Sequence, residues 1–503
     1  MNIVIFSDVN GVLGFGRYAG AYKVATELRL AGYSTQVIEF LADINLKDIE
    51  DISAKYIDRE TLFIGFSTTL LIKKTRIASI SRLDRSEQNR YSGHLPQDED
   101  FVIEMFSILK RRNPKVKIVI GGGRSSFTNL PGVDYWVWGL ADSSAVALAN
   151  HLKNGSLLIK RPGRTGEVIS FRDYPYKDFN KSKIIWEPND DLFVGEHLPI
   201  EIDRGCIFKC AFCAHPLHKK KGQYVKSPQV LKDELLYNYN HFGTTGYMFC
   251  DDTYNDSLEK VLTLYRMFNQ LPFKIEWSGY ARVDVIHSAP EQRDLLLESG
   301  LKAVLIGLET FHPGAAKEIG KGLHPDKLKE ALYYLRETWK GKVVTTGSFI
   351  VGLPGEPEDS IWETVEWLQR DDCPLDDAIF SPLNIRAPND DPDAPLSKIA
   401  LNPGNYGYTI TGPKLGTGVS TDGPQWKNEY MDKAHAEKLT RMIEESLLQK
   451  QPIANWAVYS RLRNLGYRHS ELISKRSKDT EFVKEANLRK EAIKREYFRK
   501  LLC

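Results

Sequence analysis

The chain has 503 residues, of which 42% are hydrophobic and 27% charged, with a formal net charge of +2. This is the composition of an ordinary globular protein, and about 150 residues per domain predicts roughly three domains. The small net charge gives no reason to expect a nucleic-acid or membrane partner. No apolar run approaches the roughly 18 residues of a membrane span. The start lacks a basic leader, so we expect a buried strand there rather than a signal peptide, and a cytoplasmic location.

Residues 1–159 alternate short apolar runs with amphipathic stretches. The predicted strands are Asn2–Phe6, Thr35–Phe40, Leu62–Ser67, Lys117–Ile120 and Asp134–Trp138. The predicted helices are Tyr18–Ala31, Phe101–Arg112 and Ser143–Lys153. Strands that alternate with helices at this spacing predict a doubly wound, Rossmann-like parallel sheet.

A stretch rich in proline, glycine and charge, 160–197, is predicted as a linker, and the alternation resumes over 198–385. The six strands expected there are Ile200–Asp203, Gly246–Asp251, Lys274–Ser278, Ala303–Leu308, Val343–Val351 and Ala378–Leu383. The five helices between them are Pro228–His241, Leu258–Leu271, Pro290–Ser299, Lys327–Trp339 and Pro357–Gln369. This pattern predicts a partial (β/α)6 barrel of the TIM type, with its chemistry at the carboxyl ends of the strands. Residues 386–503 are predicted to form a mostly helical accessory region.

Three of the six cysteines form a C-x3-C-x2-C run just after the first barrel strand: Cys206, Cys210 and Cys213. Three thiolates on one loop can hold three irons of a [4Fe–4S] cluster and leave the fourth iron to a small molecule with an amine and a carboxylate. The alternative is a Cys3His zinc site that includes His215 or His218. A single loop at the mouth of a barrel favours the cluster, because structural zinc sites usually draw on two separated knuckles.

This run, with Phe212 at its aromatic position, resembles the signature of the radical S-adenosylmethionine (radical SAM) superfamily. The resemblance covers residues 198–385, where later segments match the family's motifs in the right order. It implies that a reduced [4Fe–4S] cluster cleaves S-adenosylmethionine into methionine and a 5′-deoxyadenosyl radical, which abstracts hydrogen from an unactivated carbon. It also implies an electron donor such as a flavodoxin or ferredoxin.

The resemblance implies where S-adenosylmethionine binds. Asp251 or Asp252, after the second barrel strand, would accept a charge-assisted hydrogen bond from the methionyl amine. The other residues with an implied role are Arg282 at the methionyl carboxylate, Glu309 at the ribose hydroxyls, and Phe212, Ile350 and Gly352 near the adenine. Each has an ordinary structural explanation, such as a helix cap or a turn. Their recurrence at successive strand ends supports the assignment. No catalytic residue beyond these is predicted.

A doubly wound sheet directly before such a barrel resembles the cobalamin-binding domain of one branch of the superfamily. The cobalamin contacts that the resemblance implies are Gly11, Gly14, Ser67, Gly121, Gly122 and Gly123. Glycines at strand ends allow a large cofactor to approach the backbone. Two features depart from cobalamin proteins: no D-x-H-x-x-G run occurs, and Gly139-Leu-Ala-Asp142 replaces the branch's Gly-Glu-Gly-Glu-like turn. A scaffold domain without the cofactor is therefore an alternative.

The resemblance thus predicts a cobalamin-dependent radical SAM enzyme that methylates an unactivated carbon of a small molecule or peptide. A radical SAM enzyme without cobalamin, catalysing an oxidation or rearrangement, is the alternative within the family. From other classes, a zinc-stabilised binding protein and an electron-transfer protein stay open, although one three-cysteine cluster is poorly equipped for electron transfer. The sequence does not indicate the substrate.

Overall fold

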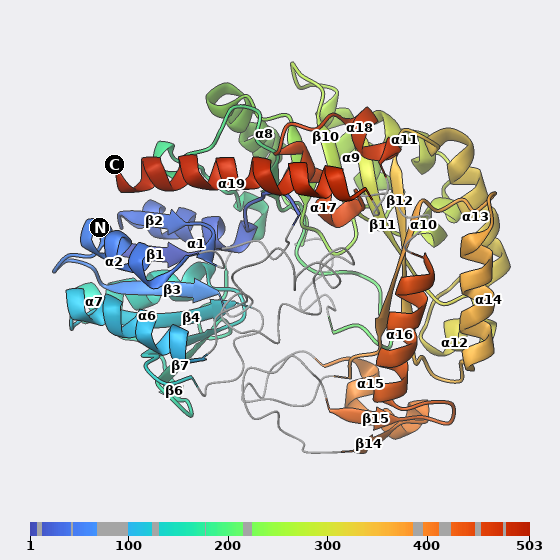
Figure 1. The fold of residues 1–503 in the computed structure, drawn as a ribbon, viewed down its shortest axis with the longest axis horizontal. Helices are drawn as coiled ribbons and strands as arrows, with labels where there is room; N and C mark the ends of the chain where they lie inside the picture. The colour runs from blue at the N-terminus through green and yellow to red at the C-terminus, as the bar shows by residue number, and fades with distance from the viewer. Residues whose placement is uncertain are drawn as a thin grey trace.

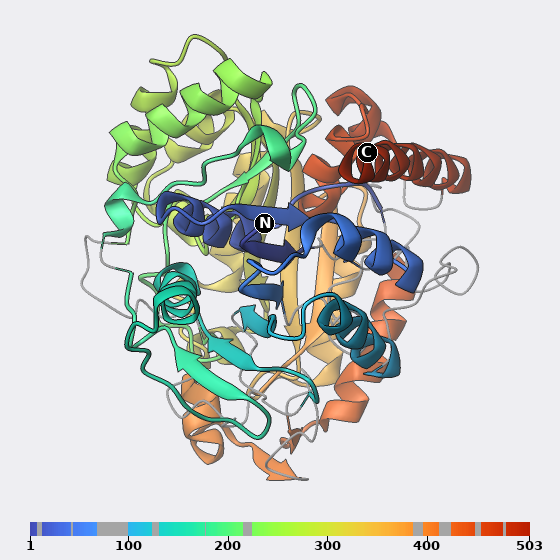
Figure 2. The ribbon, with the colours of Figure 1, turned by 90° about the vertical axis from the view of Figure 1, so that its left-hand side faces the viewer.

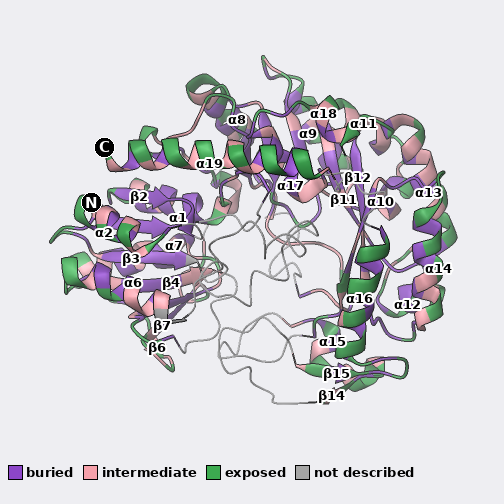
Figure 3. Ribbon diagram, viewed as in Figure 1, coloured by how far each residue is buried: buried purple, intermediate pink, exposed green. Residues whose placement is uncertain are grey.

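The computed structural model describes residues 1–7, 13–41, 44–67, 99–122, 130–176, 178–214, 224–385, 396–411, 424–447, 454–475 and 479–503. Two largely parallel sheets, one of seven strands and one of six, dominate these residues. Figure 1 shows the first sheet with its helices at the left and the second curving around the right-hand side. Their strands are largely buried (Figure 3).

The first sheet is doubly wound, as predicted. In spatial order its strands are β2 (Thr35–Ile38), β1 (Ile3–Phe6), β3 (Phe63–Ser67), β4 (Lys117–Gly122), β5 (Tyr135–Trp138), β7 (Glu167–Ser170) and β6 (Arg161–Pro162). All pair in parallel except β6, which is antiparallel to β7. The order 2-1-3-4-5 places the topological switch point between β1 and β3, where ligands of such sheets bind.

Helices cover both faces of this sheet (Figure 2). Helices α1 (Ala19–Leu30) and α7 (Asp142–Asn154) pack against each other, as do α2 (Leu46–Tyr56) and α6 (Glu99–Arg112). The sequence analysis did not predict α2, although the side chains of Asn45 and Asp48 form a reciprocal capping box at its start.

Strands β6 and β7 come from the stretch 160–197 that was expected to be a linker. Val168 and Ile169 of β7 are buried, because β7 pairs in register with β5 and extends the first sheet. This part of the stretch therefore belongs to the sheet, while the predicted domain boundaries stay predictions.

The second sheet is a partial barrel whose six strands pair in sequence order and in parallel. They are β8 (Leu198–Ile200), β9 (Gly246–Phe249), β10 (Glu276–Ala281), β11 (Leu301–Glu309), β12 (Val344–Val351) and β13 (Asp377–Pro382). The helices between them are α8 (Pro228–Phe242), α9 (Leu258–Phe268), α10 (Val283–Ser288), α11 (Gln292–Glu298), α12 (Pro313–Glu318), α13 (Pro325–Trp339) and α14 (Glu358–Gln369). The five predicted helices are present, and the short helices α10 and α12 are additional.

Strand β8 begins two residues before its predicted range, Ile200–Asp203, and ends at the first residue of that range. The backbone N–H groups of Ile202 and Asp203 donate to the Asp251 carboxylate, at 2.6 and 2.9 Å, instead of to a neighbouring strand. An apolar run predicts a strand, but it does not reveal that a side chain takes over the ladder's hydrogen bonds.

The C-terminal region is mostly helical, as expected, with one antiparallel pair of strands. Its elements are α15 (Lys398–Leu401), β14 (Thr409–Thr411), β15 (Gln425–Lys427), α16 (Lys433–Leu447), α17 (Trp456–Arg463), α18 (His469–Ser474) and α19 (Thr480–Leu502). No helix in the described part of the chain is both long and apolar enough to cross a membrane.

Helix α17 lies against the barrel sheet. Ser460 and Arg463 contact Ser278 and Glu276 of β10, with an Oγ–Oγ distance of 3.2 Å and an Nη2–Oε2 distance of 2.8 Å. Helix α19 then crosses to the first sheet (Figure 1), where the Tyr497 hydroxyl accepts from the backbone N–H at the end of β2 at 3.0 Å. The tail therefore packs on both sheets.

Candidate functional site

The cysteine loop follows β8 and is held from two sides. The Ala211 N–H donates to the carbonyl of Ile319 at 2.9 Å, and the Ala211 carbonyl accepts from the N–H of Ile399 at 3.0 Å. These contacts join the loop to the end of α12 and to α15. Cys206, Cys210 and Cys213 are all partly exposed and none is in a disulfide, so the loop presents three thiols at the carboxyl edge of the barrel.

Two polar side chains from neighbouring strand ends reach this loop. Arg282, after β10, donates from Nη1 to the Cys210 sulfur at 3.5 Å, and its guanidinium lies 3.8 Å from the centroid of the Phe208 ring. The Thr253 hydroxyl, after β9, lies 3.5 Å from the Cys206 sulfur and donates to the Asp252 carbonyl at 2.6 Å. Donors beside sulfur stabilise thiolate-held clusters and tune their potentials. The sequence analysis assigned neither Thr253 nor Phe208 to the site.

A single zinc ion and a [4Fe–4S] cluster need different arrangements of ligands. In the part of the chain that the structure describes, no group of three or more His, Cys, Asp or Glu side chains converges on a site for one metal ion. Zinc needs four ligands about 2.0–2.3 Å from one centre, whereas a [4Fe–4S] cluster gives each thiolate its own iron. The proposed zinc ligands, His215 and His218, lie outside the described residues.

The structure separates the two aspartates that the sequence left as alternatives. Asp251 is buried, and its Oδ1 accepts the backbone N–H groups of Ile202 and Asp203. Burial raises the pKa of the Asp251 carboxyl to about 6. Asp252 is exposed. Asp251 therefore acts as a brace between β8 and β9, and Asp252 is the carboxylate available to a ligand.

A buried ionic network supports the base of the cysteine loop. Lys260 of α9 donates to the Asp203 carboxylate and, at 3.0 Å, to the backbone carbonyl of Thr253. Its ammonium also lies 3.6 Å from Asp256. One ammonium serves three buried carboxyls, those of Asp203, Asp251 and Asp256. Burial and the neighbouring charge of Asp251 raise the pKa of Asp203 well above its usual range, although Lys260 opposes them. This network fixes the loops that carry Cys206 and its neighbour Thr253.

Glu309 ends β11 in a strained conformation. Its φ is +68°, which non-glycine residues rarely adopt, and the pairing of β11 with β12 shifts register between Gly307 and Glu309. Its carboxylate lies 3.2 Å from the Lys321 ammonium, which also donates to the Gly307 carbonyl at 2.8 Å. Strain of this kind costs about 1–3 kcal/mol and clusters at ligand sites, which supports the predicted ribose contact.

The residues predicted near the adenine differ in their surroundings. Phe212 and Ile350 are partly buried and pack against the hydrophobic core. Gly352 has a φ of +94°, and a Cβ there would lie 2.3 Å from the Trp426 ring. The Gly352 carbonyl accepts from the Tyr408 hydroxyl at 2.7 Å. The contact with the C-terminal region therefore explains this glycine, and its adenine role stays a prediction.

The predicted cobalamin contacts divide in a similar way. Gly121 and Gly122 end β4 and are partly exposed at the carboxyl edge of the sheet, beside Ser67 of β3. At Gly14, by contrast, a Cβ would lie 2.7–2.8 Å from Arg461 of α17. This glycine makes room for the tail helix. Gly11 and Gly123 lie outside the described residues, as does the side chain of Ser67.

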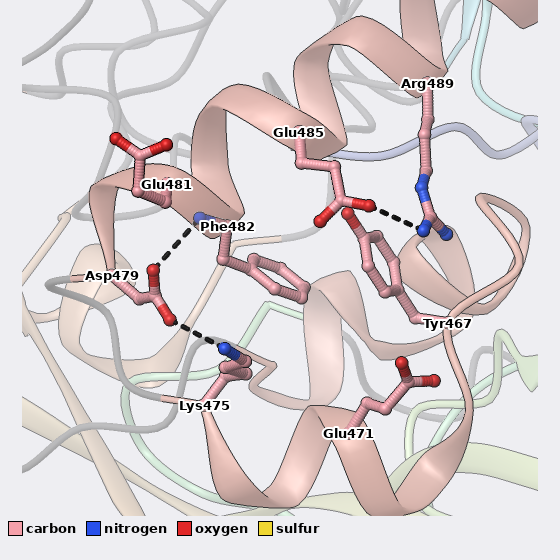
Figure 4. Close-up of a pocket in the computed structure, with 8 residues that line it drawn as sticks. All are labelled: Tyr467, Glu471, Lys475, Asp479, Glu481, Phe482, Glu485 and Arg489. Carbon is pink, nitrogen blue, oxygen red and sulfur yellow. Dashed lines mark hydrogen bonds and ion pairs between the residues drawn. The ribbon is translucent and has the colours of Figure 1, made fainter.

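A cavity of about 470 Å³ lies between α18 and α19 (Figure 4). It is lined by Tyr467, Glu471, Lys475, Asp479, Glu481, Phe482, Glu485 and Arg489. Several of these residues pair with one another, as Lys475 does with Asp479 and Arg489 with Glu485. None of the predicted site residues lines this cavity, so it adds nothing to the assignment of the strand-end site.

A partial parallel barrel with a three-cysteine loop at its carboxyl edge, joined to a doubly wound sheet, defines the class of fold and site. Residues 200–368 match the family model of the Radical SAM superfamily, so the chain carries a radical SAM domain. Among curated proteins, it is 25% identical over 279 residues to an uncharacterized methyltransferase of Pyrococcus horikoshii. That match covers 52% of this chain and spans 60% of the relative's length.

Two solved structures share the fold over the whole chain. The radical S-adenosylmethionine methyltransferase TsrM from Kitasatospora setae, determined with cobalamin and a [4Fe–4S] cluster, aligns with a TM-score of 0.61 at 14% identity. This alignment covers 100% of this chain and 99% of TsrM. The cobalamin-dependent radical enzyme OxsB, with aqua-cobalamin and S-adenosylmethionine bound, aligns with a TM-score of 0.57 at 14% identity, over 100% of this chain and 80% of OxsB. The predicted fold class is therefore confirmed.

Proposed function

We propose that the protein is a cobalamin-dependent radical SAM methyltransferase that acts on an unactivated carbon of a small molecule or peptide. The observation that carries the proposal is the cysteine loop at the carboxyl edge of a radical SAM barrel, with Arg282 and Thr253 directed at its sulfurs. The methyltransferase names of its relatives and the cobalamin-binding fold of its structural neighbours support the reaction type.

The chemistry that the bound groups supply is one-electron cleavage of S-adenosylmethionine, from the cluster, and carriage of a methyl group, from cobalamin. The chain's own residues bind and orient. Cys206, Cys210 and Cys213 hold three irons, and Asp252 accepts the methionyl amine. Glu309, already fixed by Lys321, binds the ribose hydroxyls.

Arg282 makes a contact that the resemblance did not imply. Its guanidinium is held by Asp284, from Nε at 3.0 Å and from Nη2 at 2.5 Å, and its Nη1 points at Cys210. We therefore infer that Arg282 mainly contacts the cluster sulfurs. An N–H group that contacts neither Asp284 nor Cys210 would bind the methionyl carboxylate. Guanidinium carries five N–H donors, so both contacts are compatible.

Cobalamin fits the carboxyl edge of the first sheet at β3 and β4. There Gly121 and Gly122 leave the backbone without side chains, and the φ of +117° at Gly122 suits glycine. The turn after β5 lies at the same edge, because Gly122 pairs with Gly139. The alternative is a radical SAM enzyme without cobalamin. One observation favours it: Gly14, a predicted cobalamin contact, packs against Arg461 of α17 instead.

The test is the reaction itself. Protein reconstituted with iron and sulfide without oxygen, then reduced in the presence of S-adenosylmethionine, should release 5′-deoxyadenosine. The triple variant with alanine at Cys206, Cys210 and Cys213 should release none. Cys250 lies in no cysteine cluster, so Cys250→Ala should release as much as wild type. Deoxyadenosine from the triple variant would overturn the site. We infer a flavodoxin or ferredoxin as electron donor and the reducing cytoplasm as location.

A further inference from the structure

Arg204, two residues before Cys206, binds carboxylates from both halves of the protein. Its Nη1 and Nη2 donate to the two oxygens of Asp142, at 3.0 and 2.9 Å. Its Nε and Nη2 donate to Glu201 at 2.5 and 2.9 Å. Asp142 begins α7 on the first sheet, whereas Glu201 and Arg204 follow β8. The Arg204 and Asp142 side chains are only 16% and 3% exposed, so this ion pair lies within the contact between the two sheets.

The two ends of this contact lie beside the two predicted cofactor sites. Asp142 closes the turn that begins at Gly139, and the Gly139 backbone pairs with Gly122 at the end of β4. Arg204 starts the loop that carries Cys206. A short chain of contacts therefore joins the edge proposed for cobalamin to the edge proposed for the cluster.

The arrangement holds Arg204 in one geometry. The guanidinium lies 5.1 Å from the ring centroid of Phe179 and 5.6 Å from that of Tyr176, so the rings contact it while the carboxylates bind its edges. Burial disfavours the charge, but Glu201 and Asp142 outweigh it and raise the pKa of Arg204 above its ordinary value. Lysine cannot reproduce a planar, two-sided contact of this kind, because its ammonium is a point charge on a flexible stem.

We propose that Arg204 is a positioning residue that fixes the cysteine loop against the carboxyl edge of the first sheet and thereby sets the spacing between cluster and cobalamin. The effect on spacing rests on the proposed function, whereas the fixing of the loop does not. Methyl transfer needs the two reacting centres in a defined geometry, and a shift of about 1 Å can cost about a hundredfold in rate.

Three variants and one control test the proposal. Asp142→Asn weakens the contact between the sheets, Glu201→Gln weakens the contact within the barrel, and Arg204→Lys weakens both. Arg161→Lys is the matched control, since Arg161 pairs with Asp173 at 2.8 Å within the first half of the chain. The same replacement of arginine by lysine thus alters a contact between the two sheets in one variant and a contact within the first half of the chain in the other.

The first readout is amide hydrogen exchange of the anaerobically purified protein. Residues 139–145 and 201–214 should both exchange about tenfold faster or more in Asp142→Asn and Arg204→Lys, and at the wild-type rate in Arg161→Lys. Glu201→Gln should change 201–214 alone. Wild-type exchange in both segments of Asp142→Asn would overturn the proposal. This result does not depend on any reaction, so it stands even if the wild type makes no deoxyadenosine and the proposed function fails.

The second readout is coupling. In Asp142→Asn and Arg204→Lys, methylated product per deoxyadenosine should fall by about tenfold or more, with iron and cobalt per chain unchanged. The magnetic interaction between reduced cluster and cob(II)alamin, measured by electron paramagnetic resonance, should change in the same variants. An unchanged ratio and an unchanged interaction would show that Arg204 does not set the spacing. A loss of iron in proportion to the loss of product would also overturn the proposal, because it would show that Arg204 retains the cluster rather than sets the spacing.

Discussion

Replacing the two adjacent aspartates after β9 one at a time should distinguish the residue that binds S-adenosylmethionine from the residue that stabilises the fold. Asp251→Ala removes the acceptor of two buried backbone N–H groups, those of Ile202 and Asp203. Each unsatisfied buried donor costs about 1–3 kcal/mol, so the variant should lose about 2–6 kcal/mol of unfolding free energy. Asp252 is exposed, and Asp252→Ala should change stability by no more than about 0.5 kcal/mol.

The binding assay should give the opposite ranking. Asp252→Ala loses a charge-assisted hydrogen bond worth about 1.5–3 kcal/mol, which weakens S-adenosylmethionine binding about ten- to a hundredfold. Guanidinium unfolding measures stability, and equilibrium dialysis of the reconstituted protein measures affinity. Asp233→Ala, at an exposed acid of α8, is the control for loss of a surface charge. Wild-type affinity in Asp252→Ala, with weakened binding in a fully stable Asp251→Ala, would refute this division of roles.

Three further results are expected. Glu309→Ala should weaken S-adenosylmethionine binding about ten- to a hundredfold without changing the cluster's absorption spectrum, and unchanged affinity would place the ribose elsewhere. Burial raises the pKa of Glu356, which accepts from Thr310, to about 8, so the folded protein holds this proton more tightly than the unfolded chain. The free energy of unfolding should therefore fall as the pH rises from about 4.5 to 8. In unfolding measured across this pH range, Glu356→Gln should show a smaller fall. An equally steep fall in the variant would mean that other groups cause the pH dependence. Gly122→Val should exclude cobalamin and keep the iron, as cobalt and iron analysis would show, whereas full cobalt in this variant would move the cofactor away from β4.

The sequence predicted the strands of both sheets except β6 and β7, and their main helices except α2, because buried parallel strands are continuous apolar runs and their helices are amphipathic. It could not resolve functions that depend on which side chain points where. Asp251 and Asp252 are neighbours of the same type, and only the path of β8 past β9 shows that the first accepts backbone N–H groups. The capping box at Asn45 is a local signal for α2 that the apolar pattern alone does not show.

Glycines gave the least reliable signals for the site. Gly14 and Gly352 follow strands, as glycines beside a cofactor would, yet each makes room for a residue more than seventy positions away, Arg461 or Trp426. Contacts between distant segments leave no local pattern in one sequence. The turn Gly139–Asp142 departs from the Gly-Glu-Gly-Glu-like turn of the cobalamin branch. Its acidic last residue, Asp142, proves to be the partner of Arg204.

The most direct test of the account is a count of metals in anaerobically purified protein expressed with cobalamin supplied. A [4Fe–4S] cluster and one cobalamin predict about four irons and about one cobalt per chain, with brown colour and no stoichiometric zinc. Deoxyadenosine should form on reduction with S-adenosylmethionine. About one zinc per chain with neither iron nor deoxyadenosine would contradict the central claim that Cys206, Cys210 and Cys213 hold a radical SAM cluster.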